Sequence, residues 1–327
     1  MHVLVTGAAG MIGVKLVARL LAEGALGRRA ITRLTLHDVV EPAAPAGASV
    51  PVETIAADIG DPATAARLIA ARPDVVFHLA AIVSGEAEAD FEKGYRINLD
   101  GTRALLEEIR LAGEGYRPRV VFASSVAVFG APLPEPVPED QALTPLTSYG
   151  TQKAIGELLL ADYTRRGFLD GIGIRLPTIC VRPGKPNKAA SGFFSGIIRE
   201  PLAGIEAVLP VSEDVRHWFA SPRAAVGFLV HAAVLDGEAV GPRRTLDMPG
   251  VAATVGEQIE ALRRVAGDAA VARIRREPDP TIARIIAGWP RAFAPERALA
   301  LGFRAETSFE EIVRAHVEDE LGGRLPT

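Results

Sequence analysis

The chain has 327 residues, of which 48% are hydrophobic and 23% are charged, enough to bury one large α/β domain together with a smaller lobe. Its net charge of −4 excludes the broad cationic surface that binds nucleic acid or anionic membranes, so the expected partner is a small molecule. The single cysteine, Cys180, excludes an intramolecular disulfide, and no ligand spacing around it predicts a metal site.

The N-terminal segment is predicted to be a strand rather than a signal peptide, because Gly7 interrupts its apolar run almost at once. No window approaches the roughly 18 to 20 apolar residues that cross a bilayer. Together with the lone cysteine, these features predict a cytoplasmic protein.

Short runs rich in valine, isoleucine and leucine alternate with stretches in which apolar residues recur at helical spacing. Hydrophobicity within the runs is continuous, which is typical of strands that are covered by helices on both faces. The pattern predicts a doubly wound parallel α/β sheet. The runs lie at 2–6, 31–37, 52–56, 74–79, 119–124 and 171–176.

The first strand leads into a glycine-rich turn and then a helix that Gly24 ends. Glycines there permit positive φ and let a pyrophosphate approach free N–H groups at the positive end of the helix dipole. Asp38, at the end of the second strand, is placed to accept hydrogen bonds from both ribose hydroxyls and to repel a 2′-phosphate. We therefore expect a Rossmann-type fold that binds NAD rather than NADP, with turn contacts from Gly7, Gly10, Met11, Ile12 and Gly13.

A long loop from Gly130 to Ser148, with five prolines, is predicted to be a functional lid. The helix that follows carries Tyr149 and Lys153 four positions apart, and therefore on one face. The lysine ammonium and a positive nicotinamide favour the phenolate, so we expect the pKa of Tyr149 to fall from about 10. Ser125 ends the fifth strand at the carboxyl edge of the sheet, where it can hold the reacting oxygen. Ser125, Tyr149 and Lys153 are the candidate catalytic residues.

After residue 177 the alternation of strands and helices decays. We expect residues 1–176 to form the NAD-binding domain and 222–248 to return to it. Segments 177–221 and 249–327 then form a smaller substrate-binding lobe, whose second part is mainly helical. Arg182, Lys185, Asn187 and Lys188 gather at the mouth of the expected site and could bind either a carboxylate or a diphosphate, which leaves a sugar acid and a nucleotide sugar both open.

These motifs together resemble the extended short-chain dehydrogenase/reductase family, which includes the NAD-dependent epimerases and dehydratases. The resemblance rests on TGAAGMIG, Asp58-Ile59, His78-Leu79-Ala80-Ala81, Asn98, Ser125 and YGTQK, and it covers nearly the whole chain. It implies a homodimer formed through helices around 87–112 and 149–166, and a buried, non-catalytic His78. The further cofactor contacts it implies are Asp58, Ile59, Ala80, Ala81, Asn98, Tyr149, Lys153 and Thr178.

The block VRPGKPNKAASGFFSGIIREPLAG, residues 181–204, resembles the D-erythronate dehydrogenases of this family more than its nucleotide-sugar enzymes. That resemblance implies NAD-dependent oxidation of a four-carbon sugar acid at C2 to a 2-oxo acid. Arg216 stands where the extended family often brings an arginine from the lobe, and we expect the carboxylate near Arg216 or near the loop from Arg182 to Lys188. Candidate substrate contacts are Ser84, Ser125, Tyr149, Arg182, Asn187 and Arg216.

Two alternatives remain open on the sequence alone. One is a nucleotide-sugar epimerase or dehydratase with tightly bound NAD. The other is a dinucleotide sensor without catalytic activity, which the joint presence of Ser125, Tyr149 and Lys153 disfavours.

Overall fold

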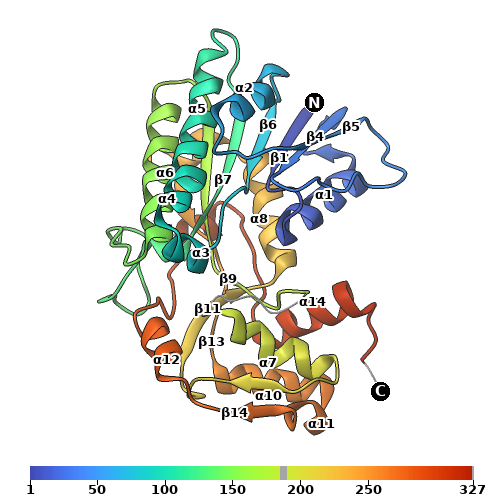
Figure 1. Ribbon diagram of the computed structural model, residues 1–327, viewed down its shortest axis with the longest axis vertical. Coiled ribbons are helices and arrows are strands. Elements are labelled where there is room, and N and C mark those ends of the chain that lie inside the picture. The colour runs from blue at the N-terminus through green and yellow to red at the C-terminus, as the bar shows by residue number, and fades with distance from the viewer. Residues whose placement is uncertain (185–189, 326–327) are drawn as a thin grey trace.

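The computed structural model describes residues 1–184 and 190–325. Its larger body is built on a seven-stranded parallel sheet in the order β12-β8-β7-β6-β1-β4-β5, and a smaller lobe lies against one end of it (Figure 1). The six apolar runs all form strands of this sheet, which confirms the predicted doubly wound fold. The strands are β1 (His2–Thr6), β4 (Arg33–Asp38), β5 (Val52–Ala56), β6 (Val75–His78), β7 (Arg119–Ser125), β8 (Asp170–Leu176) and β12 (Thr245–Asp247).

Helices cover both faces of the sheet, and β1 shows why its hydrophobicity is continuous. Val3 and Val5 pack into the layer of α1 (Met11–Glu23) and α8 (Pro222–Val234). Leu4 points into the opposite layer, formed by α2 (Pro62–Ala70), α5 (Gly101–Leu111) and α6 (Ser148–Arg165). Short elements complete this body: β2 (Ala25–Leu26), β3 (Arg29–Ala30), α3 (Ser84–Ala89), α4 (Phe91–Gly94), the π-helix η1 (Tyr95–Asp100), the 3₁₀ helix η2 (Val126–Val128) and α9 (Gly237–Val240).

Local sequence fixes where several of these helices begin. The Ser221 side chain accepts a hydrogen bond from Ala224 N at the start of α8, and Asp61 accepts one from Ala63 N at the start of α2. A proline follows each cap at the first helical position, where its missing N–H costs nothing. Because of its cap, α8 begins immediately after a lobe strand and returns to pack on α1.

The smaller lobe has its own apolar core and a three-stranded sheet in the order β13-β11-β9. Segment 249–327 contributes two strands as well as helices. Ala298 and Phe303 from this segment pack instead in the core of the larger body, beside α8. The lobe elements are β9 (Thr178–Ile179), α7 (Gly192–Leu202), β10 (Ala207–Leu209), β11 (Arg216–Ala220), β13 (Val251–Thr254), α10 (Val255–Ala266), α11 (Asp268–Val271), β14 (Ile274–Arg276), α12 (Pro280–Ala287) and α14 (Phe309–Leu321), while α13 (Glu296–Ala300) adjoins the larger body.

The proline-rich segment between η2 and α6 contains no helix and is attached to the C-terminal part of the chain. Val137 N donates to Ala292 O over 2.8 Å, and Ala294 N donates to Val137 O over 2.9 Å. Arg297 N donates to the Glu139 carboxylate over 3.0 Å. The segment therefore connects the larger body to the chain that leaves the lobe.

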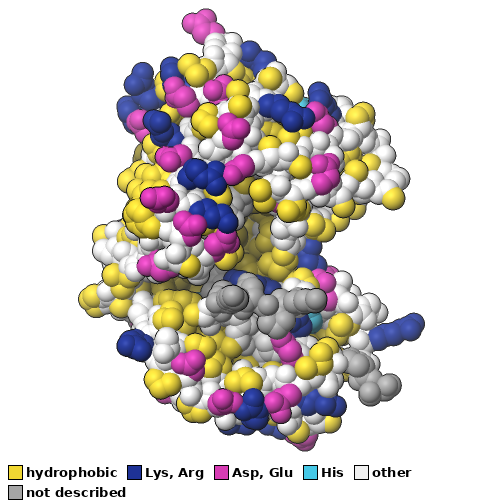
Figure 2. Space-filling model, in the orientation of Figure 1, with side chains coloured by type: hydrophobic (Ala, Val, Ile, Leu, Met, Phe, Trp, Pro, Cys, Tyr) yellow, Lys and Arg dark blue, Asp and Glu magenta, His cyan; other side chains and the backbone are white. Residues whose placement is uncertain are grey.

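Figure 2 shows the surface hollowed between the larger body and the lobe. Within the described ranges, no helix is both long enough and apolar enough to cross a bilayer.

Candidate active site

The glycine turn lies between β1 and α1, and two of its glycines have no room for a side chain. Gly7 has φ +75°, and a Cβ there would lie 2.7 Å from Ala80 N. A Cβ on Gly13 would lie 2.1 Å from the Gly7 carbonyl oxygen. The α1 N-cap, Gly10, offers no side-chain acceptor, so the first-turn N–H groups have neither a capping side chain nor a carbonyl one turn earlier. Such a turn fits a bound pyrophosphate.

Asp38 lies directly beside this turn. Its Oδ2 accepts from Ala9 N over 2.9 Å, and its Oδ1 accepts from Val39 N over 2.7 Å. Each carboxylate oxygen keeps a further lone pair that can accept a hydroxyl. Asp38 therefore holds the glycine turn against the end of β4 and presents its carboxylate beside that turn.

The other expected cofactor contacts follow β5 and β6. Asp58 forms an ion pair of 2.6 Å with Arg96; partial burial works to raise the pKa of Asp58, but this arginine and the Gly60 N–H lower it further. Ile59 is buried, whereas Ala80 and Ala81 are half-buried just beyond β6.

Asn98, on the π-helix η1, is buried and joins two segments. Its Oδ1 accepts from Ile82 N over 2.8 Å, and its Nδ2 donates to Gln152 on α6 over 2.8 Å. Asn98 thus holds the chain after β6 in register with the helix that carries Tyr149.

His78 is a core residue. Its ring nitrogens contact the hydroxyls of Thr6 and Thr102 at 2.8 and 2.9 Å. Burial lowers the pKa of His78 to about 3, so the ring is neutral. The implied non-catalytic role of His78 agrees with this environment.

Ser125, Tyr149 and Lys153 meet at the carboxyl edge of β7. Lys153 is 3% exposed, donates from Nζ to Ala123 O over 2.8 Å, and lies 5.7 Å from the centroid of the Tyr149 ring. Burial lowers the pKa of Lys153 to about 8. The start of α6 lies so close to η2 that a Cβ on Gly150 would come within 2.1 Å of Ala127 O.

The pKa of Tyr149 departs from the sequence-based expectation. In the chain without cofactor it is raised, because burial outweighs the opposing influence of Arg182 and of a hydrogen bond with Ser125. Arg182 is therefore a cation that favours the phenolate here, a role beyond the substrate contact that the sequence argument assigned to it.

Arg182 is half-buried beside Tyr149, and its Nε donates to Ile179 O over 3.1 Å. Burial lowers the pKa of Arg182, although the guanidinium stays charged near neutrality. No carboxylate in ranges 1–184 and 190–325 lies within ion-pair distance of it. Arg182 is therefore available to an anionic ligand.

The other expected substrate contacts are less clearly directed to this point. Arg216 begins β11, donates to Ala252 O over 3.3 Å and lies 3.7 Å from Glu257. Ser84 is half-buried at the start of α3. Asn187, with Lys185 and Lys188, falls outside the described residues.

Thr178 and His217 form a fixed pair at the lobe side of the site. The Thr178 hydroxyl lies 2.6 Å from His217 Nε2, and Nδ1 lies 2.9 Å from Pro290 O. A carbonyl only accepts, so Nδ1 carries the proton and Nε2 accepts from Thr178. Burial lowers the pKa of His217 to about 4, which keeps it neutral and leaves the Thr178 oxygen free to accept from a ligand.

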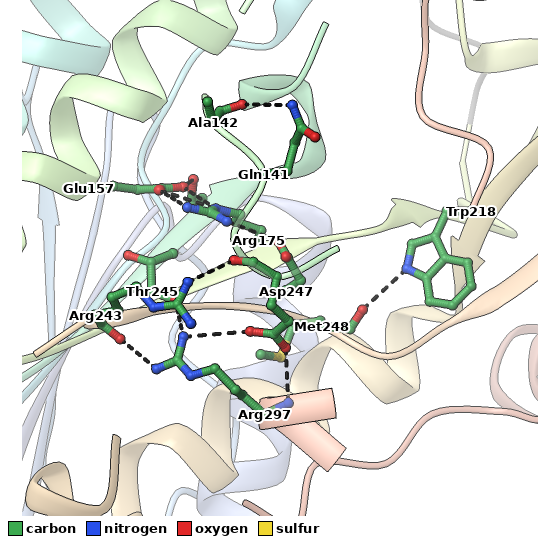
Figure 3. Close-up of polar contacts among 12 residues, drawn as sticks. Gln141, Ala142, Glu157, Arg175, Trp218, Arg243, Thr245, Asp247, Met248 and Arg297 are labelled. Carbon is green, nitrogen blue, oxygen red and sulfur yellow. Dashed lines mark hydrogen bonds and ion pairs between the residues drawn. The ribbon is translucent and has the colours of Figure 1, made fainter. Parts of the chain in front are cut away.

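Sequence reasoning missed a buried ionic network beneath Ser125. Arg175 donates from Nη2 to Glu157 over 2.7 Å and from Nη1 to Asp247 over 3.1 Å, as Figure 3 shows. Glu157 also accepts from the Ser124 hydroxyl. The one sequence signal for this network was that Glu157 follows Lys153 by one helical turn. No sequence feature connected Asp247 with Arg175 or Glu157.

A cavity of about 580 Å³ lies at the amino ends of the strands, lined among others by Tyr116, Arg119 and Asp170. It is at the opposite edge of the sheet from Ser125 and is separate from the candidate active site. In the described part of the chain, histidine, cysteine and acidic side chains form no group of three that could hold a metal ion.

Comparisons with known proteins agree with this arrangement. Residues 3–222 match the model of the NAD dependent epimerase/dehydratase family. The chain is 53% identical to D-erythronate dehydrogenase from Cupriavidus necator, over 98% of both chains, and 42% identical to D-erythronate dehydrogenase from Haemophilus influenzae, over 98% of this chain and all of the other.

A similar solved structure carries a different name from these two relatives. A crystal structure of a nucleoside-diphosphate-sugar epimerase from Agrobacterium tumefaciens is 66% identical and superposes with a TM-score of 0.98, covering all of this chain and 96% of that one. L-threonine dehydrogenase from Cupriavidus necator, 22% identical with a TM-score of 0.83, covers 98% of this chain and 99% of that one and shows the shared fold.

Proposed function

Because the chain belongs to the NAD-dependent epimerase/dehydratase family, we propose that it oxidises D-erythronate at C2 to 2-dehydro-D-erythronate with NAD. Two relatives with the matching activity in their names align over nearly the full chain. The observation that carries the proposal is the position of Arg182, a cation without a carboxylate partner in the described ranges, beside the phenol of Tyr149. A hydroxy acid has its hydroxyl and its carboxylate on adjacent carbons and matches such a pair.

The residues present fit NAD. The glycine turn would hold the pyrophosphate, and Asp38 would accept the ribose hydroxyls and disfavour the 2′-phosphate of NADP. Asp58 with Ile59 would adjoin the adenine, and Lys153 would adjoin the nicotinamide ribose. When bound, NAD accepts the hydride that leaves C2.

In the proposed reaction the C2 hydroxyl lies between Ser125 and Tyr149. The Tyr149 phenolate accepts the hydroxyl proton as C2 loses its hydride, and Ser125 donates to the same oxygen as it becomes a carbonyl. The Lys153 ammonium favours the phenolate electrostatically, and Arg182 fixes the carboxylate so that C2 is aligned.

A nucleotide-sugar epimerase is the rival, and the structural relative at 66% identity is its support. The two differ in net chemistry, because an epimerase reoxidises its cofactor in each turnover. Purified protein should accumulate NADH with D-erythronate, and less rapidly with other three- to six-carbon aldonic acids. Turnover confined to a UDP-sugar, without net NADH, would reject the proposal.

We further propose a homodimer through α5 and α6. Large apolar side chains on and next to these helices are exposed: Leu158 by 67%, Phe91 by 60% and Leu111 by 58%. A second copy covering them would remove that apolar surface from water. Leu158→Glu should convert a dimer to a monomer in sedimentation experiments; a wild-type monomer at micromolar concentration would contradict the proposal.

A further inference from the structure

Four charged side chains are buried around α6 and the carboxyl ends of the neighbouring strands β8 and β12. Lys153, Glu157, Arg175 and Asp247 are 3%, 4%, 9% and 2% exposed. Two are cations and two are anions, so their formal charges cancel. Ions are tolerated in an interior when they are paired and hydrogen-bonded, and removal of one partner leaves an uncompensated charge.

Glu157 is the centre of this group. Its carboxylate accepts from both Nε and Nη2 of Arg175, at 3.1 and 2.7 Å, and from the Ser124 hydroxyl. Asp247, at the sheet edge on β12, accepts from the remaining arm of the same guanidinium at 3.1 Å. The Glu157 carboxylate is thereby fixed by Ser124 on β7 and by Arg175 on β8, and Figure 3 shows the contact with Arg175.

The same carboxylate fixes the end of β7. Lys153 holds the carbonyl of Ala123, and Glu157, one turn further along α6, holds the side chain of Ser124. Ser125 follows immediately, and its hydroxyl accepts from Ala127 N over 3.1 Å. Two successive residues before Ser125 are therefore held by two successive turns of the helix that carries Tyr149.

Glu157 also supplies the nearby negative charge that acts on Lys153. Burial lowers the pKa of Lys153 to about 8, and the Glu157 carboxylate opposes that fall. His78, which faces Lys153 from β6, is neutral. From β7 only the Phe122 ring and a backbone carbonyl face the ammonium. Charged side chains of the helices packed on α6 pair at the surface: Lys93 with Glu86, and Glu107 with Arg110.

We propose that Glu157 is a positioning residue for the proposed dehydrogenation: it holds Ser125 in place through Ser124, and it keeps Lys153 in its ammonium form beside Tyr149. The inference rests on the proposed function, because it concerns the proton transfer assigned there. Without this carboxylate, Lys153 loses its proton more readily, and the phenolate loses a neighbouring positive charge.

The two effects of Glu157 can be separated by two variants. Glu157→Gln removes the charge and keeps an oxygen that can accept from Ser124. Ser124→Ala removes that hydrogen bond and keeps the charge. In Glu157→Gln, the ascending limb of kcat/KM against pH should move upward by about one pH unit, because an opposite charge at close range changes a pKa by about this much. In Ser124→Ala, kcat should fall while the limb stays in place.

Two more variants secure the result. Glu157→Asp retains the charge and should restore the wild-type limb. Asp247→Asn removes the network's other anion, leaves the Glu157 contacts intact, and should move the limb in the same direction by less. The proposal would be overturned if the ascending limb of kcat/KM against pH stayed in place in both Glu157→Gln and Asp247→Asn. It would also be overturned if this limb moved equally in Glu157→Gln and Ser124→Ala.

A readout without substrate distinguishes this inference from the proposed function. The pKa of Lys153 itself, followed by NMR through the lysine signal that is lost in Lys153→Arg, should fall in Glu157→Gln and stay in place in Ser124→Ala, because Glu157 is the charge that opposes the effect of burial on Lys153. Absence of NADH production from D-erythronate would reject the substrate but leave this titration to decide the role of Glu157.

Discussion

At the scale of single residues, the site combines groups whose charge states are set by burial. Lys153 and Arg182 approach Tyr149 from different elements, α6 and the segment after β9, and each favours a negative charge at the phenol position. Burial raises the pKa of Tyr149 in the chain alone, so deprotonation depends on these cations and on the positive charge of bound nicotinamide.

Replacing the proposed proton acceptor gives the most direct test. Tyr149→Phe should lower kcat for NADH production by a factor on the order of 10² or more, since a positioned acid/base contributes this much. NAD affinity, measured by calorimetry, should change little. Turnover close to that of the wild type would remove Tyr149 from the mechanism.

The choice between two arginines is the second residue-scale test. Arg182→Met should raise KM for D-erythronate roughly 10- to 100-fold, the equivalent of one charge-assisted hydrogen-bonded contact. Arg216→Met is the matched control, and its effect should be smaller because Arg216 already contacts Glu257 and Ala252 O. Steady-state kinetics of both variants decide the matter, and the reverse ranking would assign the carboxylate to Arg216.

Sequence could identify residues that act through local spacing. The glycine turn and the Tyr149–Lys153 pair are each contained in one short segment, so their geometry follows from a turn or a helix. Glu157 and Asp247 meet only through Arg175, across 90 positions of the chain, and a single sequence carries no signal for that contact. The influence of Arg182 on Tyr149 was missed for the same reason.

At the scale of elements, the contact between β1, the glycine turn and α1 leaves no room for a side chain at Gly13. Gly13→Ala should therefore force the turn apart, lower the free energy of unfolding by about 1–3 kcal/mol and weaken NAD binding. Gly196→Ala on α7 is the control, because a Cβ there meets only the flexible Glu200 side chain at 3.4 Å. Urea denaturation and NAD titration of the two variants check this; equal effects would contradict it.

Element boundaries were predictable where local chemistry sets them. Gly24, with φ +64°, ends α1, and capped starts such as Ser221-Pro222 begin α8. The strands β13 and β14 lie within a segment that was expected to be mainly helical. They were not predicted, because each is only three or four residues long and pairs with a strand that is distant in the sequence. Such short strands have no periodicity of their own.

At the scale of the whole molecule, buried histidines make stability depend on pH, and His78 and His217 have the most strongly lowered pKa values among them. The pKa of His78 is lowered to about 3 and that of His217 to about 4 from an ordinary 6.5, in both cases by burial. Below about pH 6.5 these histidines bind protons in the unfolded chain but stay neutral in the folded chain. Their contribution to stability is therefore complete above pH 6.5 and is lost as pH falls toward 4.

Asp247 works in the opposite direction over part of this range. Burial raises its pKa from 3.8 to about 6, so its contribution is lost as pH rises from about 4 to 6. Two histidines outweigh one aspartate, so the free energy of unfolding should fall between pH 6.5 and 4.5, by about 1.4 kcal/mol per pH unit for each uncompensated histidine. Urea titrations across this range should show a shallower slope for His217→Asn; an unchanged slope would mean that His217 is protonated in the folded protein.

The chain order of the central sheet has a further consequence, which concerns synthesis. Six strands of the sheet are complete by Leu176, but β12, the edge strand that pairs with β8, begins only at Thr245. During translation β8 is therefore an unpaired edge strand while much of the lobe is synthesised. Over the same interval Arg175 is without its ion-pair partner Asp247. Such late, long-range closure is slow and leaves an unpaired strand open to association with other chains. A nascent chain arrested before residue 245 should thus be the form of this protein most in need of a chaperone.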